Sequence, residues 1–339
     1  MNVSRRSLLT ASAAATAAFA ATALSACTTS ASSPGAGGSD SSSDDAAPVT
    51  IKHIYGTTEI PSTPTRVATV SWVNADTALA LGVVPVAMPA MEWGGNGNRS
   101  TDWIDAKLAE LGGPAPTLFS EADGINADAI AAATPDVILA AYSGLTKDEY
   151  EKLSKIARVV GPIKANYLTS WQEAATVIGA ALRKDPKELI SSVEKQITDA
   201  GKDIPKGTTF IASTLDTAAN TISLYTGDDT RPRLLRALGM TEAEVVRKNA
   251  PKDQFFFEWS PERADELDSD VIYSWIPAGT KPEAVKANSL FGRIPAVQND
   301  KLIVTDSDHA TLSVSAASAL SLPWAVKNVI PAWIETITA

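Results

Sequence analysis

Short apolar runs alternate with segments of helical spacing along the first half of the chain. The runs are rich in β-branched side chains and are bounded by turn residues, which is typical of strands. Two of the helical segments begin with a capping box, Thr146 with Glu149 and Ser170 with Glu173. Strand and helix in repeated alternation predict a three-layer α/β unit. The predicted strands are 66–71, 83–88, 136–141 and 159–160.

The alternation restarts after one long helical segment. Asp185-Pro186 supplies a helix start, and apolar residues follow at helical spacing as far as Ala200. We therefore predict two three-layer α/β lobes, 49–185 and 205–339, joined by one long helix within 186–204. The later strands are predicted at 209–213, 221–225, 270–275 and 302–305, and helices at 231–238, from 260 and over 310–327, the last broken at Pro323.

The first 48 residues have the pattern of an export signal and a tether. Residues 1–26 place Arg5 and Arg6 before a long apolar run, which predicts a signal peptide. The segment ending in Leu24-Ser25-Ala26-Cys27 resembles a bacterial lipobox, so Cys27 is the expected lipidation site. A membrane-spanning segment and a buried structural cysteine are the alternatives. The paired arginines leave general and twin-arginine export both open.

Residues 27–48 are rich in Ser, Gly, Ala and Asp and lack aromatic side chains. Such a segment cannot bury enough apolar surface to fold, so we expect a flexible tether. A signal peptide, a lipid anchor and a tether together predict an exported protein held at the outer face of the cytoplasmic membrane.

Composition removes several classes of function. The net charge is −10, from 29 Lys and Arg against 39 Asp and Glu, which argues against nucleic acid as a partner. One cysteine and two histidines exclude a disulfide framework and a Cys-rich zinc site. The chain has no Gly-x-Ser-x-Gly elbow and no His-Glu-x-x-His motif. We therefore expect no enzyme, although a carboxylate-dependent extracytoplasmic hydrolase stays an alternative.

Several segments of the body, taken in their order along the chain, carry a family resemblance. They are 66–83, 126–138, 142–157, 260–267 and 289–291. In this order, and with the lipobox, they resemble the iron-siderophore substrate-binding lipoproteins of ABC importers, the class III proteins with a single helical hinge. The resemblance implies a ligand site between two lobes, a ferric siderophore as ligand, a membrane permease as partner, a monomer and no cofactor. A haem- or cobalamin-binding protein of the same fold and an adhesion or scaffold lipoprotein are the alternatives.

Ligand sites of open α/β sheets lie beyond the carboxyl ends of the strands, so we sought aromatic and cationic residues there. A bulky ferric chelate needs flat apolar walls and a few fixed cations. The alternatives are core packing for Trp72, an ordinary mobile surface loop for Trp93 and Arg99, a salt bridge to Asp228 or Asp229 for Arg231, and a structural histidine for His309. One of Phe255–Phe257 is a further candidate wall, with a core role favoured. The predicted ligand-binding residues are Trp72, Trp93, Arg99, Tyr142, Tyr225, Arg231, Trp275 and His309.

The resemblance also implies a docking surface for the permease. Family members present a carboxylate from each lobe, and Asp76 matches the first-lobe position, as Asp in place of the usual Glu. A helix-terminal charge stabilised by the dipole is the alternative for Asp76. The second-lobe segment 231–239 is basic, which leaves the second contact open. No set of side chains is expected to bind the iron directly, and the sequence does not choose among siderophore classes.

Overall fold

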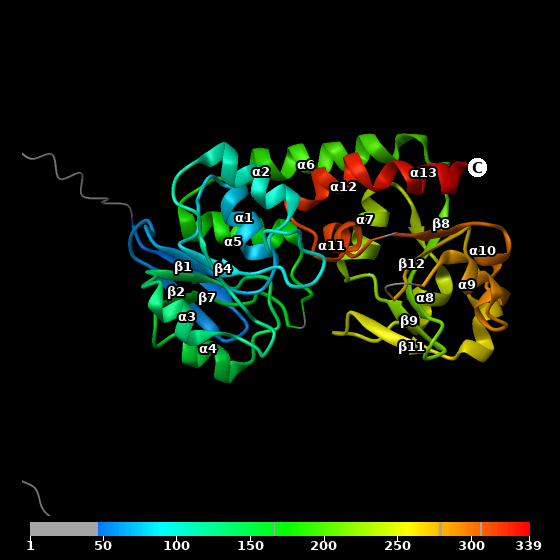
Figure 1. Cartoon of the computed structure of the whole chain (residues 1–339), viewed down its shortest axis with the longest axis horizontal. Helices are drawn as coiled ribbons and strands as arrows, with labels where there is room; N and C mark the ends of the chain where they lie inside the picture. The colour runs from blue at the N-terminus through cyan, green and yellow to red at the C-terminus, as the bar shows by residue number, and fades with distance from the viewer. Residues whose placement is uncertain (1–46, 166, 278–279, 306) are drawn as a thin grey trace, which may run out of the picture. The chain divides into compact units, whose positions relative to one another are not determined.

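A parallel five-stranded sheet forms the centre of the first lobe (Figure 1). The computed structural model describes residues 47–165, 167–277, 280–305 and 307–339, which lie in one compact unit. The predicted signal peptide, Cys27 and nearly all of the predicted tether lie outside the described residues. The strand order is β5-β4-β3-β6-β7. The strands are β3 (Val67–Thr69), β4 (Ala87–Pro89), β5 (Thr117–Phe119), β6 (Val137–Leu139) and β7 (Arg158–Val160).

Helices cover both faces of this sheet. Alternate strand residues point to opposite sides, so Val67 packs with one group of helices and Ala68 with the other. The first face is covered by α1 (Val73–Ala80), α2 (Asp102–Leu111) and α5 (Trp171–Leu182), and the second by α3 (Ala127–Ala132) and α4 (Lys147–Leu153). The antiparallel hairpin of β1 (Val49–His53) and β2 (Gly56–Ile60) packs beside β7 and α5.

The second lobe is built on a mixed sheet with the order β11-β9-β8-β12-β13. Here β12, β13 and the short β10 run parallel to β8 within the sheet, whereas β9 pairs antiparallel with both β8 and β11. The strands are β8 (Thr209–Asp216), β9 (Thr221–Tyr225), β10 (Thr241–Glu242), β11 (Phe256–Trp259), β12 (Val271–Trp275) and β13 (Leu302–Val304).

This sheet is also covered on both faces. Phe210 and its alternate neighbours pack with the longer helices, and Ile211 packs with the shorter ones. The longer helices are α6 (Lys187–Ala200), α7 (Thr230–Ala237), α11 (Asp308–Ser315), α12 (Ser321–Asn328) and α13 (Ile330–Thr338). The other face carries α8 (Glu244–Asn249), α9 (Pro282–Ala287), α10 (Pro295–Gln298) and the 3-10 turns η2 (Pro261–Glu266) and η3 (Phe291–Arg293).

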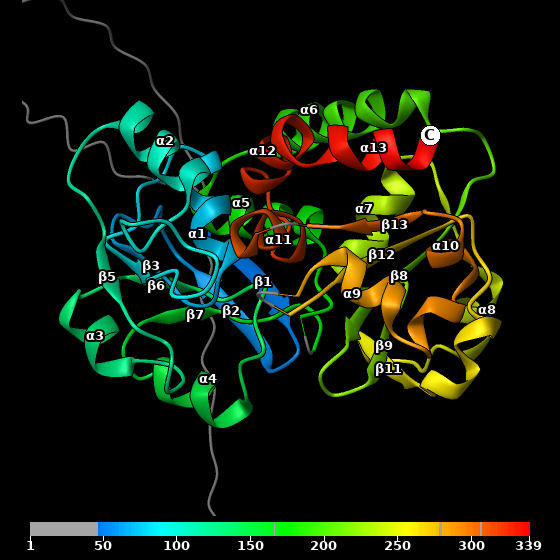
Figure 2. The ribbon, with the colours of Figure 1, turned by 45° about the vertical axis from the view of Figure 1, so that its right-hand side comes forward.

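One helix leads from the first lobe into the second. α6 follows α5 and is succeeded by the short turn η1 (Gly201–Asp203) and then β8. It lies beside α12 in both views (Figures 1 and 2), and the two helices are in contact. Val193 and Ile197 are its buried residues, and most of its other side chains face outward. The predicted fold class, two three-layer α/β lobes joined by one long helix, is confirmed. No helix in the described residues has the length and apolar character needed to cross a membrane.

The helical segment predicted over 310–327 divides earlier than expected. α11 ends at Ser315 and α12 begins at Ser321, whereas Pro323 lies in the first turn of α12. A proline is tolerated there because the first N–H groups of a helix have no intrahelical partner. The intervening turn is held by Ser318 and Ser321, each of whose backbone N–H donates to the other's hydroxyl at 2.9 Å.

Candidate ligand-binding site

A cavity of about 430 Å³ lies where loops of the two lobes face each other. Such a volume is in the range of small-molecule sites. Its first-lobe residues follow the carboxyl ends of β3, β5, β6 and β7. After β3 the chain adds β4 and β5 on one side and then returns to add β6 and β7 on the other, so the topological switch point lies between β3 and β6. This is where ligands bind in open α/β sheets. The lining residues are Ser71, Trp72, Glu121, Tyr142, Tyr167, Asp229, Arg231, Phe255 and Ser315.

A buried asparagine fixes the two loops at this switch point. The Asn74 side chain donates to the carbonyl oxygens of Val70 at 2.7 Å and Tyr142 at 2.8 Å, and accepts from the Tyr142 N–H at 3.1 Å. It is fully buried, so these bonds are shielded from water. Asn74 therefore holds Trp72 and Tyr142 in fixed relation. Asn74 lies in the first turn of α1.

Two aromatic pairs form much of the cavity surroundings. Trp72 and Trp93 stack with ring centroids 6.2 Å apart and are 42% and 36% exposed, so both offer free surface to a ligand. Tyr142 and Tyr167 are tilted rings 5.5 Å apart. Gly144 permits this second pair, because a Cβ at residue 144 would lie only 2.6 Å from the Tyr167 ring. Trp72, Trp93 and Tyr142 thus lie together, as the sequence predicted for a shared site, although Trp93 itself is not part of the cavity lining.

Both aromatic loops contain a residue with left-handed backbone geometry. Ser71 has φ 59° and Tyr167 has φ 61°, values that are uncommon for residues other than glycine. Such strained positions persist only where surrounding contacts hold them, and they concentrate at binding sites. The turn at Ser71 presents Trp72 to the cavity directly after β3.

Arg231 supplies the cation of the second-lobe wall. Its Nε and Nη2 donate to the two Asp229 carboxylate oxygens, both at 2.7 Å, and its guanidinium lies 3.5 Å above the centre of the Tyr225 ring. Burial works against this charge, but Asp229 outweighs burial and keeps the Arg231 pKa above its ordinary value. Nη1 has only a 3.5 Å contact, with Ser315, and is the nitrogen left for a ligand. The predicted alternative, a salt bridge, is therefore present within the site itself.

Glu121 forms a polar point on the first-lobe wall. Its Oε2 accepts a 3.0 Å hydrogen bond from the Ser71 N–H. Burial raises the Glu121 pKa to about 7, the Ser71 N–H acts in the opposite direction, and the Glu149 charge raises the pKa further. The sequence gave no reason to select Glu121, because the strand before it, β5, has only three residues and its apolar pattern is too short to be recognised.

Besides Trp93 and His309, three predicted ligand-binding residues lie outside the cavity lining. Tyr225 is buried beneath Arg231, with its hydroxyl 2.6 Å from Thr214 Oγ1, so it supports the cation instead of facing a ligand. Arg99 is turned to Glu92, with an ion pair of 3.0 Å at the surface. Trp275 ends β12 away from the lining residues. Each follows a strand or lies in a glycine-containing loop, but such local positions do not determine which way a side chain points.

His309 is also placed differently from the prediction. Its Nδ1 lies 2.6 Å from the Gly94 carbonyl oxygen, and its ring packs between Trp103 and Trp324 with centroids 5.0 Å from each. Its Nε2 is 3.5 Å from an Asp102 carboxylate oxygen. These contacts connect α11 to the loop and helix that follow β4. His309 is therefore a structural link between the lobes.

The prediction that Asp76 contacts the permease is wrong, because its side chain is buried. The carboxylate oxygen Oδ1 accepts hydrogen bonds from Trp103 Nε1 and from Ser318 Oγ, both at 2.7 Å. Ser318 lies between α11 and α12, so this carboxylate also joins the lobes. Burial raises the Asp76 pKa to about 6, although both hydrogen bonds favour the charged form.

Replacing Asp76 by asparagine will remove a pH-dependent loss of folding stability. The folded-state pKa lies above the ordinary value of 3.8, so the folded protein takes up a proton more readily than the unfolded chain. Relative to the Asp76→Asn variant, the native protein will lose about 3 kcal/mol of unfolding free energy as the pH rises from about 3 to about 7. Denaturant unfolding of both proteins across this range measures the difference, and a difference that does not vary with pH would contradict the expectation.

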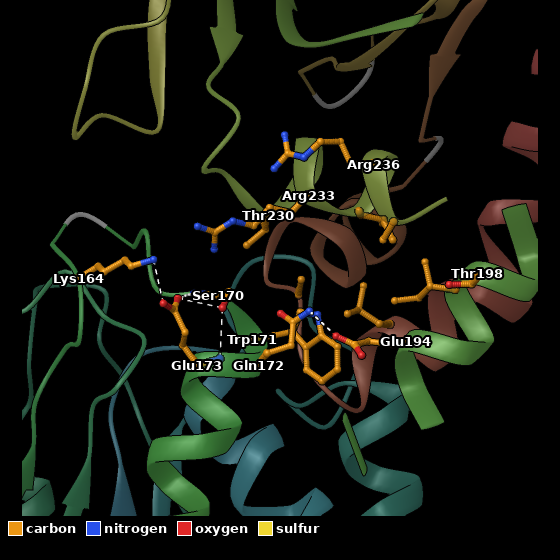
Figure 3. A pocket seen from close by; sticks show the side chains of 15 residues that line it. Lys164, Ser170, Trp171, Gln172, Glu173, Glu194, Thr198, Thr230, Arg233 and Arg236 are labelled. Carbon is orange, nitrogen blue, oxygen red and sulfur yellow. Dashed lines mark hydrogen bonds and ion pairs between the residues drawn. The ribbon is translucent and has the colours of Figure 1, made fainter. Parts of the chain in front are cut away.

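A second, larger hollow of about 740 Å³ lies among α5, α6 and α7 (Figure 3). Some of its polar groups pair with one another, whereas Arg233 and Arg236 bond to residues outside the lining and Arg233 Nη1 is buried without a hydrogen-bond partner among the described residues. Lys164 pairs with Glu173 at 2.8 Å, and the Gln172 amide donates to Glu194 at 3.1 Å, as Figure 3 shows. Trp171 is its only aromatic residue and is buried. The smaller cavity, whose lining includes four aromatic side chains, is therefore the stronger candidate for a site that binds a bulky chelate with an apolar periphery.

Metal ligands do not gather in the part of the chain that the structure describes. No group of three or more His, Cys, Asp and Glu side chains there could hold an ion. Tyr142 also lacks the features of a preformed ligand to iron, because burial raises the pKa of its phenol and so disfavours the phenolate. The described lining provides aromatic walls and hydrogen-bonding groups.

Comparisons with known proteins extend over both lobes. A family model described as periplasmic binding protein matches residues 67–309. The crystal structure of PiaA from Streptococcus pneumoniae TIGR4 in complex with ferrichrome is 31% identical, with a TM-score of 0.79 over 85% of this chain and 98% of that one. A periplasmic solute binding protein from Mycobacterium smegmatis is 28% identical, with a TM-score of 0.71 over 86% of this chain and 99% of that one.

A curated relative agrees with the structural neighbours. The probable siderophore-binding lipoprotein YfiY of Bacillus subtilis is 28% identical over 230 residues, which are 66% of this chain and 67% of that protein. The resemblance seen in the sequence is thereby confirmed. Since the family model spans most of the chain and PiaA aligns over almost its whole length, the chain belongs to the periplasmic binding protein family.

Proposed function

We propose that this chain captures a ferric siderophore in the cavity between its lobes and delivers it, chemically unchanged, to the permease of an ABC importer. The observation that carries the proposal is the cavity itself, in which four aromatic side chains and one fixed cation converge where loops of the two lobes meet. Trp72, Tyr142, Tyr167 and Phe255 offer flat walls, and Arg231 offers donors. A ferric chelate with an apolar periphery fits these groups.

Relatives support the same ligand class. PiaA is bound to ferrichrome in its crystal structure, and YfiY is described as a siderophore-binding lipoprotein. In this proposal the chelator supplies the iron ligands. Transfer to a permease follows from the substrate-binding family and needs a surface other than Asp76.

Tryptophan fluorescence tests the proposal directly. The full chain, kept in a mild detergent, is titrated with ferrichrome, ferric bacillibactin, haem and cobalamin. We expect saturable quenching by a ferric siderophore at submicromolar concentration, because Trp72 and Trp93 border the cavity. Saturation by haem or cobalamin alone would overturn the choice of ligand and leave the fold unaffected. No quenching by any of them, from protein with a normal circular dichroism spectrum, would contradict the proposal.

Lipid anchoring is part of the same proposal. It rests on the lipobox-like segment ending at Cys27 and on the lipoprotein relative. Replacing Cys27 by serine removes the thiol that would carry the lipid, so we expect the variant to leave the membrane fraction for the soluble extracytoplasmic fraction. Fractionation followed by mass spectrometry of the mature amino terminus measures this. Thr28→Ser is the matched control and should stay with the membrane; membrane retention of the Cys27 variant would contradict the anchor.

A further inference from the structure

Glu121 is unusual among the residues of the candidate cavity because half of its carboxylate is buried without a partner. Oε2 is held by the Ser71 N–H at 3.0 Å, but Oε1 has no hydrogen-bond partner among the described residues. A buried acceptor left unsatisfied costs free energy, which a ligand donor would recover. Because Oε2 is already held, Oε1 is the carboxylate atom whose hydrogen-bonding capacity is left unused.

The charges around the cavity leave Glu121 uncompensated. The only cation in the lining, Arg231, is already neutralised by Asp229 through two hydrogen bonds. Glu121 makes no ion pair with any described residue. An ionised Glu121 therefore gives the lining a net negative charge. The proposed ligand is a ferric siderophore, and many ferric siderophores are anionic, so this charge would repel them.

We propose that Glu121 is a specificity-determining residue, whose free Oε1 accepts a hydrogen bond from an ammonium or amide N–H of the bound ferric chelate and whose charge disfavours anionic chelates. This inference rests on the proposed function and narrows its ligand class. Three hydroxamates neutralise Fe(III), whereas three catecholates leave an anionic complex. A negative charge in a partly desolvated cavity attracts a cationic group and costs free energy against an anionic one. The favoured ligands are neutral or cationic hydroxamate chelates.

The protonation of Glu121 sets how strong this selection is. Burial raises its pKa to about 7, so the carboxylate is charged in mildly alkaline solution and largely neutral in mildly acidic solution. The groups that face it are Glu149 from α4, the phenol of Tyr167, which itself feels the Glu121 charge, and the Arg231–Asp229 pair across the cavity. Glu92 is near through its hydrogen bond with Ser120, the residue before Glu121. None of these supplies an unpaired cation.

Three ferric chelates of different charge test the predicted selectivity. Ferrioxamine B is a hydroxamate with a free ammonium group, and ferrichrome is a neutral hydroxamate. Ferric bacillibactin is an anionic triscatecholate. Dissociation constants are measured by fluorescence quenching of the full chain in mild detergent at about pH 8.5. For the native protein we expect ferric bacillibactin to bind at least ~10-fold more weakly than ferrichrome. In Glu121→Gln we expect ferrioxamine B to weaken ~10-fold, ferrichrome to change less than ~3-fold, and ferric bacillibactin to strengthen ~10-fold.

The matched control is Glu59→Gln, which changes net charge equally from an exposed position on β2 and should leave all three constants unchanged. A second arm needs no variant: the preference of native protein for ferrioxamine B over ferrichrome should fall ~10-fold between about pH 8.5 and about pH 5.5. Equal effects of Glu121→Gln on all three chelates, or tight binding of ferric bacillibactin by native protein, would overturn the inference while the proposed function stands. No binding of any ferric chelate would overturn both.

Discussion

Replacing Asp229 by asparagine will lower the free energy of unfolding by about 3 kcal/mol. The Asp229 and Arg231 side chains are only 7% and 13% exposed and are joined by two hydrogen bonds of 2.7 Å. Asparagine keeps an oxygen that can accept from the Arg231 N–H at the start of α7, so the helix cap is preserved. What is lost is the countercharge, which leaves a buried guanidinium uncompensated. Urea unfolding at neutral pH measures the change.

The double variant Asp229→Asn with Arg231→Met separates loss of the pair from loss of the cation. Because methionine removes the charge that needs a partner, most of the stability lost in the single variant should return. Methionine also keeps apolar contact with the Tyr225 ring. If the free energy of unfolding of the double variant is lower than that of Asp229→Asn by about a further 3 kcal/mol, the two side chains contribute independently and the interpretation fails.

Replacing Trp72 by alanine will raise the dissociation constant of the ferric siderophore by about 30- to 100-fold. Trp72 lines the cavity, is 42% exposed without ligand, and stacks on Trp93, which fixes its orientation. A large, rigid aromatic wall of this kind typically contributes about 2–3 kcal/mol to binding. Removal of Trp93 should weaken binding by about fivefold, because it acts mainly by supporting Trp72. Isothermal titration calorimetry avoids the loss of fluorescence in these variants.

Trp275→Phe is the control that the sequence itself supplies. The sequence predicted Trp275 as a ligand-binding residue on the same grounds as Trp72, since each follows a strand, but the structure leaves it outside the cavity lining. Its replacement should change the dissociation constant by less than about twofold. Equal losses in Trp72→Ala and Trp275→Phe would mean that the ligand occupies a different region.

Local features of the fold were readable from the sequence. Both predicted capping boxes are present, because the box joins residues only three positions apart and needs no distant partner. The apolar strands 137–139 and 271–275 were recognisable for a related reason, since burial on both faces demands a continuous apolar run. The short edge strands β10 and β11 were missed, because two to four residues carry too little pattern.

The candidate site was predictable only in part. Trp72 and Tyr142 follow central parallel strands, whose carboxyl ends meet at one edge of the sheet, so the order of strands and the rule for such sheets were sufficient. Phe255 was considered in the sequence as a candidate wall, with a core role favoured, and Tyr167, Glu121 and Ser315 were not among the predicted residues. Their place in the cavity depends on how the second lobe lies against the first.

Sequence alone determined the alternation of strands and helices, the two lobes, the joining helix and the family, because these depend on periodicity and on order along the chain. Tertiary structure alone decided the roles of Asp76, His309 and Glu121. Asp76 has the sequence context of a helix-terminal charge, yet Ser318, 242 positions away, completes its buried hydrogen bonds. His309 likewise meets Gly94 across 215 positions. The role of a polar side chain is set by its partners and its burial, and here those partners come from distant parts of the chain.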